Sequence, residues 1–380
     1  RQRQMCIRDS FKRADIFLLA VCMICTIFGI VMIYSMTSSY GWAKYVVVQG
    51  FAMFLGIGAF VVFTVIDPDL IADKWVYLTI FNVLFIVGLI FFGKGDEVGS
   101  RAWYRFAGIG VPPSEIVKVI FIVLIAKQMA TYKEQRTLNK FPSVLKLGIH
   151  WALYFGLITV IPNDLGSALI FLAIFVVMLI CAGIAWYWMA AAAAVVAAMI
   201  PLFWNFFLAD YQKNRILAPY IPDVVDPTGQ GITWQMNLCK DALASGRWTG
   251  VGFGEGSFSQ SSYNARHTDC VFASIGEELG MVACIAIIVL LSIIIIRCCV
   301  IGVRSGSPFG MLICFGVATA LAFQTFINIG MCIGITPVIG ITLPFFSYGG
   351  SSIVAMYAAV GLVSGVKYRP KPRQNFLQYQ

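Results

Sequence analysis

Ten long apolar runs constrain this chain more than any other feature of its sequence. A helix needs about 20 predominantly apolar residues to cross the hydrocarbon core of a bilayer. Such runs lie near 14–36, 44–66, 75–92, 114–130, 146–161, 165–182, 184–207, 270–296, 309–334 and 341–366. Only 12% of the residues are charged, against about 25% in soluble domains. We therefore predict an all-α, polytopic integral membrane protein of about ten transmembrane helices.

The positions of lysine and arginine predict how these helices are oriented. The connector 127–146 carries five basic residues, whereas the short connectors on the opposite face carry few. Because cytoplasmic loops are enriched in Lys and Arg, we expect both termini to be cytoplasmic. The expected parts are a cytoplasmic N-terminus (1–13), one membrane domain (14–366) and a basic cytoplasmic tail (367–380).

The start of the chain needs separate interpretation. The chain begins at Arg1 rather than Met, and one interpretation of residues 1–10 is a non-native extension. We exclude them from the fold prediction. The first apolar run is long enough to span a membrane, so we expect no cleavable signal peptide.

The net charge of +9 points to a charged partner. Nucleic acid is not expected, because no basic stripe with interleaved aromatic residues occurs. Anionic headgroups of membrane lipid are the more natural partner.

One connector differs from all others. Residues 208–269 form a long, polar, Gly- and Pro-containing segment between the seventh and eighth runs. Loops of this length tend to be functional. With the termini inside, this large loop is extracytoplasmic, as is the charged, glycine-rich connector 93–113. We therefore expect any chemistry at the outer membrane–water boundary.

The strongest candidate stretch is Arg266-His267-Thr268-Asp269, followed by Glu277 and Glu278. It lies where the large loop enters the eighth apolar run. Ionisable residues at membrane depth are costly and are functional candidates by default. The alternative is structural: Thr268 or Asp269 is simply the N-cap of the helix.

A second candidate stretch contains Arg101, Trp103, Glu115 and Lys118. Glu115 and Lys118 are three residues apart, which places both on one helix face. The pair is either a mutual neutralisation or, with Arg101 and Trp103, a binding site for an anionic headgroup, since Arg and Lys are the phosphate ligands.

Two further stretches have structural default interpretations. Asp164 precedes a helix, where a cap is its usual role. Ser347 lies in Pro344-Phe-Phe-Ser-Tyr-Gly-Gly-Ser-Ser352, which we place in the last helix and assign to close helix packing.

Other patterns carry little chemistry. The glycines of 250–256 lack GxGxxG spacing and a βαβ context. The two histidines and eleven cysteines form no zinc motif, and most cysteines are interpreted as small apolar packing residues. A disulfide between Cys239 and Cys270, which both face outward in this topology, is left open by the sequence.

Together these stretches resemble the SEDS family (shape, elongation, division and sporulation proteins; RodA/FtsW-like) from about residue 14 to 368. The resemblance rests on Arg-x-Trp, Pro-Ser-Glu, Asp-Leu-Gly-Ser, His-Thr-Asp…Gly-Glu-Glu-Leu-Gly and Leu-Pro-Phe-x-Ser-Tyr-Gly-Gly-Ser-Ser, in this order. Pro112, Asn163 and Cys270 depart from the family pattern, which bears on subfamily and substrate details.

The resemblance implies a peptidoglycan glycosyltransferase that polymerises lipid II into a growing glycan chain at the bacterial cytoplasmic membrane, with a class B penicillin-binding protein as partner. It implies an inverting reaction on an undecaprenyl-pyrophosphate-linked donor. Asp269 is the expected catalytic base. The expected substrate-binding residues are Arg101, Trp103, Glu115, Lys118, Asp164, Arg215, His267, Thr268 and Ser347.

Two other functions stay open: a flippase for a lipid-linked oligosaccharide and a non-catalytic scaffold for the synthase. No cofactor is expected with certainty; a divalent cation is an option for which the sequence shows no protein site. Elongation, division and sporulation roles are not distinguished by the sequence.

Overall fold

The computed structural model describes residues 14–38, 41–93, 102–106, 109–208, 210–261 and 263–367. Most of the described chain is helical, as predicted. The helices of the first half are α2 (Ile16–Thr37), α3 (Trp42–Val65), α4 (Pro68–Ala72), α5 (Trp75–Val87), α6 (Leu89–Phe92), α7 (Pro113–Glu134), α8 (Phe141–Val160) and α9 (Leu165–Ala182). Those of the second half are α10 (Trp186–Leu202), η2 (Phe203–Phe207), α11 (Asp210–Leu217), α12 (Pro222–Val225), α13 (Trp234–Gly246), η3 (Asn264–His267), α14 (Val271–Arg304), α15 (Pro308–Ile333) and α16 (Gly350–Lys367).

The predicted membrane spans are confirmed as helices. Within the described residues, nine helical segments are long and apolar enough to cross a membrane. The one predicted span outside these nine is the run 114–130. It forms α7, a 22-residue helix that contains the charged residues Glu115 and Lys118. An antiparallel hairpin of β1 (Tyr104–Phe106) and β2 (Ile109–Val111) precedes it. The chain is therefore an integral membrane protein with a helical bundle.

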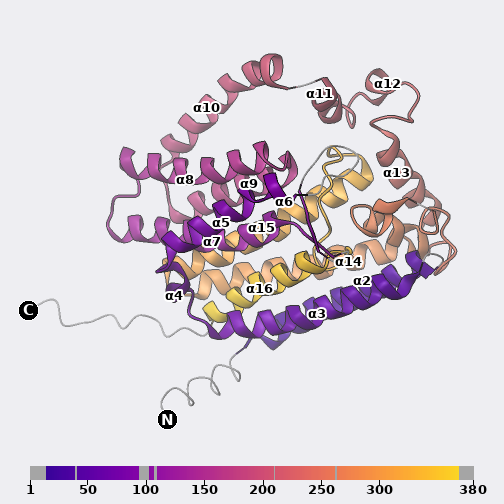
Figure 1. Ribbon diagram of the computed structural model, residues 1–380, viewed down its shortest axis with the longest axis horizontal. Coiled ribbons are helices and arrows are strands. Elements are labelled where there is room, and N and C mark those ends of the chain that lie inside the picture. Colours follow the sequence, from indigo (N-terminus) through magenta and orange to yellow (C-terminus); the bar gives the residue numbers. More distant parts are fainter. Residues whose placement is uncertain are drawn as a thin grey trace, which may run out of the picture.

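The long helices run side by side, which gives the bundle two distinct ends (Figure 1). One end holds the start of α2, the end of α16 and α4; we call it the terminal end. The other holds the β-hairpin and α11, α12 and α13 of the large loop; we call it the loop end. Helix α10 lies apart from the other helices, and none of its described side chains is buried.

An ion cluster joins three helices at the terminal end. The Asp15 carboxylate, 1% exposed, caps α2 by accepting from the Leu18 amide. It also forms ion pairs with Arg297 (2.9 Å) and Lys367 (3.1 Å). Two cations compensate the buried charge, and the cluster holds the N-terminus of α2 against α14 and the C-terminus of α16.

Small residues allow α16 to approach its neighbours closely. A Cβ added at Gly361 would lie 2.6 Å from the Phe60 carbonyl oxygen of α3, and one at Gly56 would lie 2.7 Å from the Tyr357 ring. Such contacts are typical of membrane helix packing. They fix α16, and with it the segment 335–349 that leads into it.

Three predicted runs differ from the structure in detail. The run 75–92 is interrupted at Gly88, where α5 ends and α6 begins. Helix α14 is broken at Gly280 (φ 78°), where the amide of Met281 donates to Arg247 O and that of Val251 donates to Glu277 O. A Cβ at Gly280 would lie 2.4 Å from the Trp248 carbonyl, so only glycine fits there.

The largest difference concerns the last predicted run. Residues 341–349 are not helical, and α16 begins only at Gly350. The expectation that the Ser347 motif lies in the last helix as a packing element is therefore wrong. The segment instead folds across the loop end, where its polar groups make specific hydrogen bonds described below.

Candidate active site at the loop end

Asp269 lies between η3 and α14, at the entry of the large loop into the bundle. The N-cap of α14 is Cys270, which makes no side-chain capping bond. Neither Thr268 nor Asp269 is therefore the cap of this helix. The Asp269 side chain is half-buried. Its carboxylate lies beside Gly340, since a Cβ added to that glycine would be 3.5 Å from Asp269 Oδ2.

The backbone around Asp269 is held by three hydrogen bonds from the end of the chain. The Tyr348 amide donates to His267 O at 2.8 Å. The Ser347 hydroxyl donates to Thr268 O at 2.6 Å, and the Asn328 amide donates to Asp269 O at 2.7 Å. Three successive carbonyls are thus fixed, so the predicted residues His267, Thr268 and Ser347 act on the position of Asp269.

His267 is buried and neutral near pH 7. Its ring contacts those of Tyr45 and Tyr348 edge-on, with centroids 5.0 and 5.5 Å away. Burial, with a smaller effect of the Arg266 charge, lowers the pKa of His267 to about 4. The imidazole therefore supplies no cation for a phosphate at neutral pH.

The two glutamates that follow have structural partners. The Glu277 carboxylate, 1% exposed, accepts from the amides of Phe258 and Ser259 and from the hydroxyls of Ser257 and Ser259, at 2.9–3.1 Å. Glu278 accepts from the Ser35 hydroxyl at 2.6 Å. Glu277 therefore holds the large loop against α14, and Glu278 holds α14 against α2.

The predicted pair on α7 exists and is buried. Lys118 Nζ lies 2.8 Å from Glu115 Oε2, and the Gln324 amide of α15 donates to Glu115 Oε1 at 3.2 Å. These three side chains line a small cavity between α7, α15 and α16, with apolar residues such as Ile122 and Met356. The charge of Lys118 is thus balanced inside a mostly apolar space.

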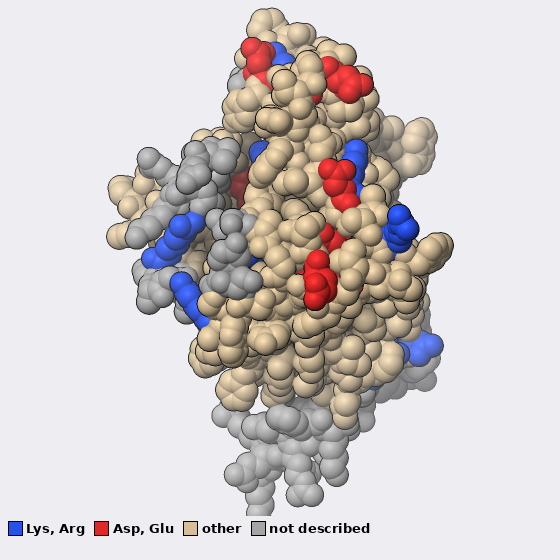
Figure 2. Space-filling model, turned by 90° about the vertical axis from the view of Figure 1, so that its right-hand side faces the viewer, with Lys and Arg blue, Asp and Glu red and all other residues tan. Residues whose placement is uncertain are grey.

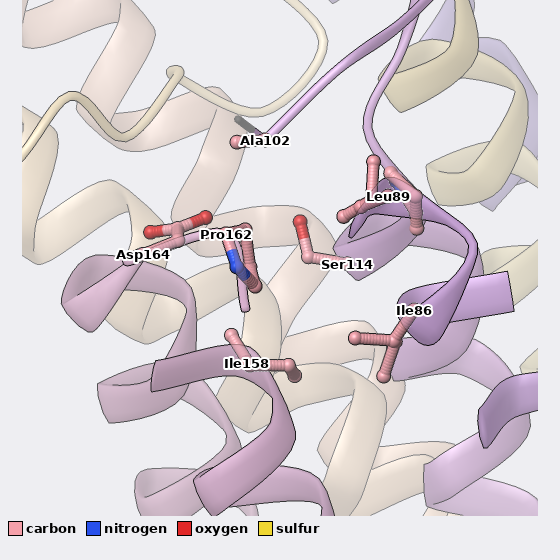
Figure 3. Close-up of a pocket in the computed structure, with 8 residues that line it drawn as sticks. Ile86, Leu89, Ala102, Ser114, Ile158, Pro162 and Asp164 are labelled. Atoms are coloured by element: carbon pink, nitrogen blue, oxygen red, sulfur yellow. The ribbon is translucent and has the colours of Figure 1, made fainter. Parts of the chain in front are cut away.

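Asp164 caps α9 and lies beside this pair. Its carboxylate accepts from the amide (2.9 Å) and hydroxyl (2.6 Å) of Ser167, so the predicted cap is confirmed. Burial raises the pKa of Asp164, while the Ser167 bonds and the Lys118 charge lower it. Asp164 also lines a second small cavity, in which its carboxylate and the Ser114 hydroxyl lie towards Ala102 (Figure 3).

Helix α15 links the Asp269 and Lys118 regions. Gln324 binds Glu115, and Asn328, one turn further on, binds Asp269 O and Ile341 O. The segment 339–341 provides a second link, since Ile339 packs on Gly166 of α9 and Gly340 lies next to Asp269. One helix face and one segment therefore position both candidate regions.

The remaining predicted residues are less closely connected. Trp103 is half-buried and its ring lies over Gly110 of β2; the Ser351 hydroxyl holds that strand to α16 at 3.2 Å. Arg101 lies outside the described residues. Arg215 is exposed on α11, and within the described chain no hydrogen bond or ion pair joins it to the α7 pair or to Asp269.

Viewed from the loop end, the surface carries scattered acidic and basic side chains among mostly uncharged residues (Figure 2). Among the described residues, no group of three or more His, Cys, Asp or Glu is arranged to hold a metal ion.

Three buried carboxamides were not identified from the sequence. Gln324 and Asn328 connect the two regions, and Gln49 of α3 donates to Ser347 O and accepts from the Gly349 amide. All three are at most 1% exposed. Polar residues within membrane spans usually have a specific partner, and the spacing of Gln324 and Asn328 on one face was the available signal.

The chain is similar to known proteins over nearly its full length. Residues 15–371 match the family model described as cell cycle protein, of the FtsW, RodA and SpoVE type. The chain is 30% identical to a probable peptidoglycan glycosyltransferase FtsW of Geobacter metallireducens, over 95% of this chain and 96% of that protein. It is 31% identical to the peptidoglycan glycosyltransferase MrdB of Escherichia coli K12, over 82% of each.

Two solved structures share the fold. One, described as "Structural coordination of polymerization and crosslinking by a peptidoglycan synthase complex", has a chain with a TM-score of 0.79 and 24% identity, covering 94% of this chain and 99% of that one. The rod shape determining protein RodA of Thermus thermophilus has a TM-score of 0.69 and 22% identity, covering 94% and 98%.

Proposed function

The chain belongs to the FtsW, RodA and SpoVE family of cell cycle proteins, and from this we propose that it is a membrane glycosyltransferase that polymerises lipid II into peptidoglycan strands. Its relatives are named peptidoglycan glycosyltransferases. The single observation that carries the proposal is the placement of Asp269: a half-buried carboxylate on a backbone fixed by three hydrogen bonds at the loop end.

In this proposal Asp269 is the general base. The acceptor sugar's 4-hydroxyl transfers its proton to the carboxylate as its oxygen attacks the anomeric carbon of the donor. The bond from that carbon to the undecaprenyl pyrophosphate breaks, and the pyrophosphate leaves with the electron pair. One displacement inverts the anomeric configuration and needs no covalent nucleophile.

The leaving pyrophosphate requires cations opposite it. We propose Lys118 and Arg101 for this role, with Trp103 and Asp164 lining the headgroup site and Arg215 approaching from the large loop. Lys118 is paired with Glu115 at 2.8 Å, so its contribution requires that the incoming phosphate compete with this carboxylate. If Lys118 leaves Glu115 for the phosphate, Glu115 keeps its hydrogen bond to Gln324 of α15. Substrate binding would thereby be coupled to the contact between α7 and α15.

A direct assay tests this function. The purified protein, alone and with its class B penicillin-binding protein, is given lipid II and assayed for glycan strands in the presence of moenomycin. We expect moenomycin-resistant polymerisation that increases with the partner. Lipid II that remains monomeric in both reactions would contradict the proposal and favour a scaffold or a flippase.

The proposed site requires the loop end to face outward from the cytoplasmic membrane, with both termini inside. Val224→Cys, at a side chain 77% exposed on α12, should react with a membrane-impermeant thiol reagent in intact spheroplasts. Gln135→Cys, exposed at the terminal end, should react only after lysis. Both variants are made in a background without Cys181 and Cys299, which are partly exposed. The reverse labelling pattern would remove the site from outer-leaflet lipid II.

A further inference from the structure

Three cysteines from three helices meet at the loop end. Cys239 lies on α13 of the large loop, Cys270 is the N-cap of α14, and Cys332 lies on α15. Each is at most 1% exposed. Gln235, one turn before Cys239 on α13, donates to Cys270 Sγ, and each thiol is a side-chain neighbour of the other two. No two of them are neighbours in sequence, so only the tertiary fold brings them together.

The trio is next to the candidate catalytic residue. Cys270 directly follows Asp269, and Cys332 Sγ lies 4.0 Å from Asp269 O. The amide of Gln235, on α13, donates to Cys270 Sγ at 3.3 Å. A covalent bond within this trio would therefore act one residue away from Asp269.

Cys270 is the thiol most suited to be a thiolate. It occupies the N-terminus of α14, where the helix dipole favours negative charge. Hydrogen bonds from the Cys239 and Cys332 thiols and from Gln235 lower the pKa of Cys270. Thiolates, not thiols, perform disulfide exchange, so Cys270 is the attacking group.

We propose that Cys239 and Cys270 form a disulfide that joins α13 of the large loop to the residue after Asp269. Cys239 lies on α13 of the large loop and Cys270 precedes α14, so neither is part of a membrane-spanning helix, whereas Cys332 is part of α15. The inference rests on the proposed orientation, which exposes the loop end to an oxidising compartment in which disulfides persist.

The chemistry needs an oxidant that is itself a disulfide, either a thiol oxidoreductase or a small-molecule disulfide. The Cys270 thiolate attacks one sulfur of the oxidant, forms a mixed disulfide and releases a thiolate. Cys239 loses its proton, attacks the Cys270 sulfur and releases the second thiolate. Two cysteines thereby lose two electrons and two protons, and the oxidant is reduced to two thiols. Because both cysteines are buried, the bond forms while the large loop closes over α14.

The redox state in the cell tests the proposal. Cells are acid-quenched, free thiols are alkylated with N-ethylmaleimide, and the purified protein is digested and analysed by mass spectrometry before and after reduction. We expect a linked peptide pair containing Cys239 and Cys270, and two additional alkylatable thiols after reduction. Alkylation of all three cysteines without reduction, or a Cys270–Cys332 pair, would overturn the proposal.

Matched variants separate the bond from its surroundings. Cys239→Ser should remove the linked pair and leave Cys270 alkylatable, while Cys332→Ala and Cys284→Ser should keep the linked pair. Loss of the pair in Cys332→Ala would contradict the assignment. If the variants fold poorly, the same mapping of the unmodified chain after incubation with oxidised glutathione decides: a different pairing overturns the proposal.

The disulfide and the proposed function fail in different ways. Lipid II polymerisation by the reduced protein reports on the function and does not require the bond. If the Cys239–Cys270 pair forms with oxidised glutathione but is absent from cells, the proposal of a disulfide in the cell is overturned. The labelling of Val224→Cys then reports separately whether the loop end faces outward.

Discussion

Asp269 and Glu277 are two carboxylates at the same entry to α14, eight residues apart, and they differ in how deeply they are buried. Glu277 is 1% exposed and accepts four hydrogen bonds from residues 257–259. Asp269 is half-buried, and three hydrogen bonds fix the backbone carbonyls of residues 267–269.

The difference indicates two roles for chemically similar groups. A buried carboxylate that accepts four hydrogen bonds from one segment holds that segment in place. A half-exposed carboxylate on a rigid backbone can meet a substrate in one geometry, which is what a general base requires. The variants below test whether activity and stability separate in this way.

The largest effect is expected from Asp269→Asn. Loss of the base should lower lipid II polymerisation by about 10²–10⁴-fold, while thermal unfolding in detergent stays unchanged. Asp269→Glu should retain a trace of activity, because the carboxylate is displaced by about one methylene. Near-normal glycan synthesis by the Asn variant would end the assignment.

The next effect concerns the α7 pair. Lys118→Met alone leaves the Glu115 carboxylate buried without its cation, which should cost about 3–5 kcal/mol of stability. The double variant Glu115→Gln/Lys118→Met removes both charges and should restore stability. If Lys118 binds pyrophosphate, the double variant should still polymerise about 10²-fold more slowly. Recovery of activity together with stability would reduce the pair to a structural role.

Glu277→Gln should show the opposite pattern to Asp269→Asn. In the Gln variant an NH₂ group replaces one carboxylate oxygen that accepts two hydrogen bonds, so two donors lose their acceptor. The free energy of unfolding should therefore fall by about 2–3 kcal/mol. Activity per folded molecule should be retained. The measurement is a denaturation curve beside a polymerisation assay; a stable but inactive Gln variant would transfer the catalytic role towards Glu277.

His267 predicts a dependence of stability on pH. Its pKa of about 4 in the folded chain lies below the unfolded value of about 6.5. Below pH 6.5 the unfolded chain binds a proton that the folded chain does not, so stability falls as pH decreases from about 6.5 to 4. Between pH 7 and pH 5 the loss should be about 2 kcal/mol. His267→Gln should flatten this part of the curve, and an unchanged pH profile would contradict the assignment.

The smallest effect is expected from the positioning bond of Asn328. Asn328→Ala removes the donor to Asp269 O and should lower kcat about 10-fold with little change in KM, because a small displacement of the base affects the reaction more than binding. Thr325→Val is the matched control, since the Thr325 hydroxyl donates only within α15, to Leu321 O. Equal losses in both variants would indicate general damage to α15.

The predicted helices were recognisable from the sequence because the signal is local. A run of about 20 apolar residues has few alternatives in a bilayer, where every backbone group must be paired within the segment. The departures at Gly280 and in 341–349 depend on distant partners instead. The break at Gly280 is formed by hydrogen bonds of the flanking residues with 247–251. The segment 341–349 is held by bonds to Gln49, Asn328 and Thr268.

The candidate site shows the same division. Charge placement near the outer boundary identified Asp269, Glu115, Lys118 and Asp164. It did not separate Asp269 from Glu277, since the residues that satisfy Glu277 come from the large loop. It also missed Gln324 and Asn328, whose roles depend on which side chains of α7 and the large loop face α15.

By itself, the sequence determined that the chain is a membrane-embedded helical protein, because apolar length and charge placement act through the bilayer without reference to any other part of the chain. Only the tertiary structure decided which carboxylate is held by donors, which residue caps α14, and which cysteines meet beside Asp269. Those outcomes depend on contacts between segments far apart in the chain, such as Ser347 with Thr268, which are 79 residues apart, and such contacts leave no periodic signal in the chain.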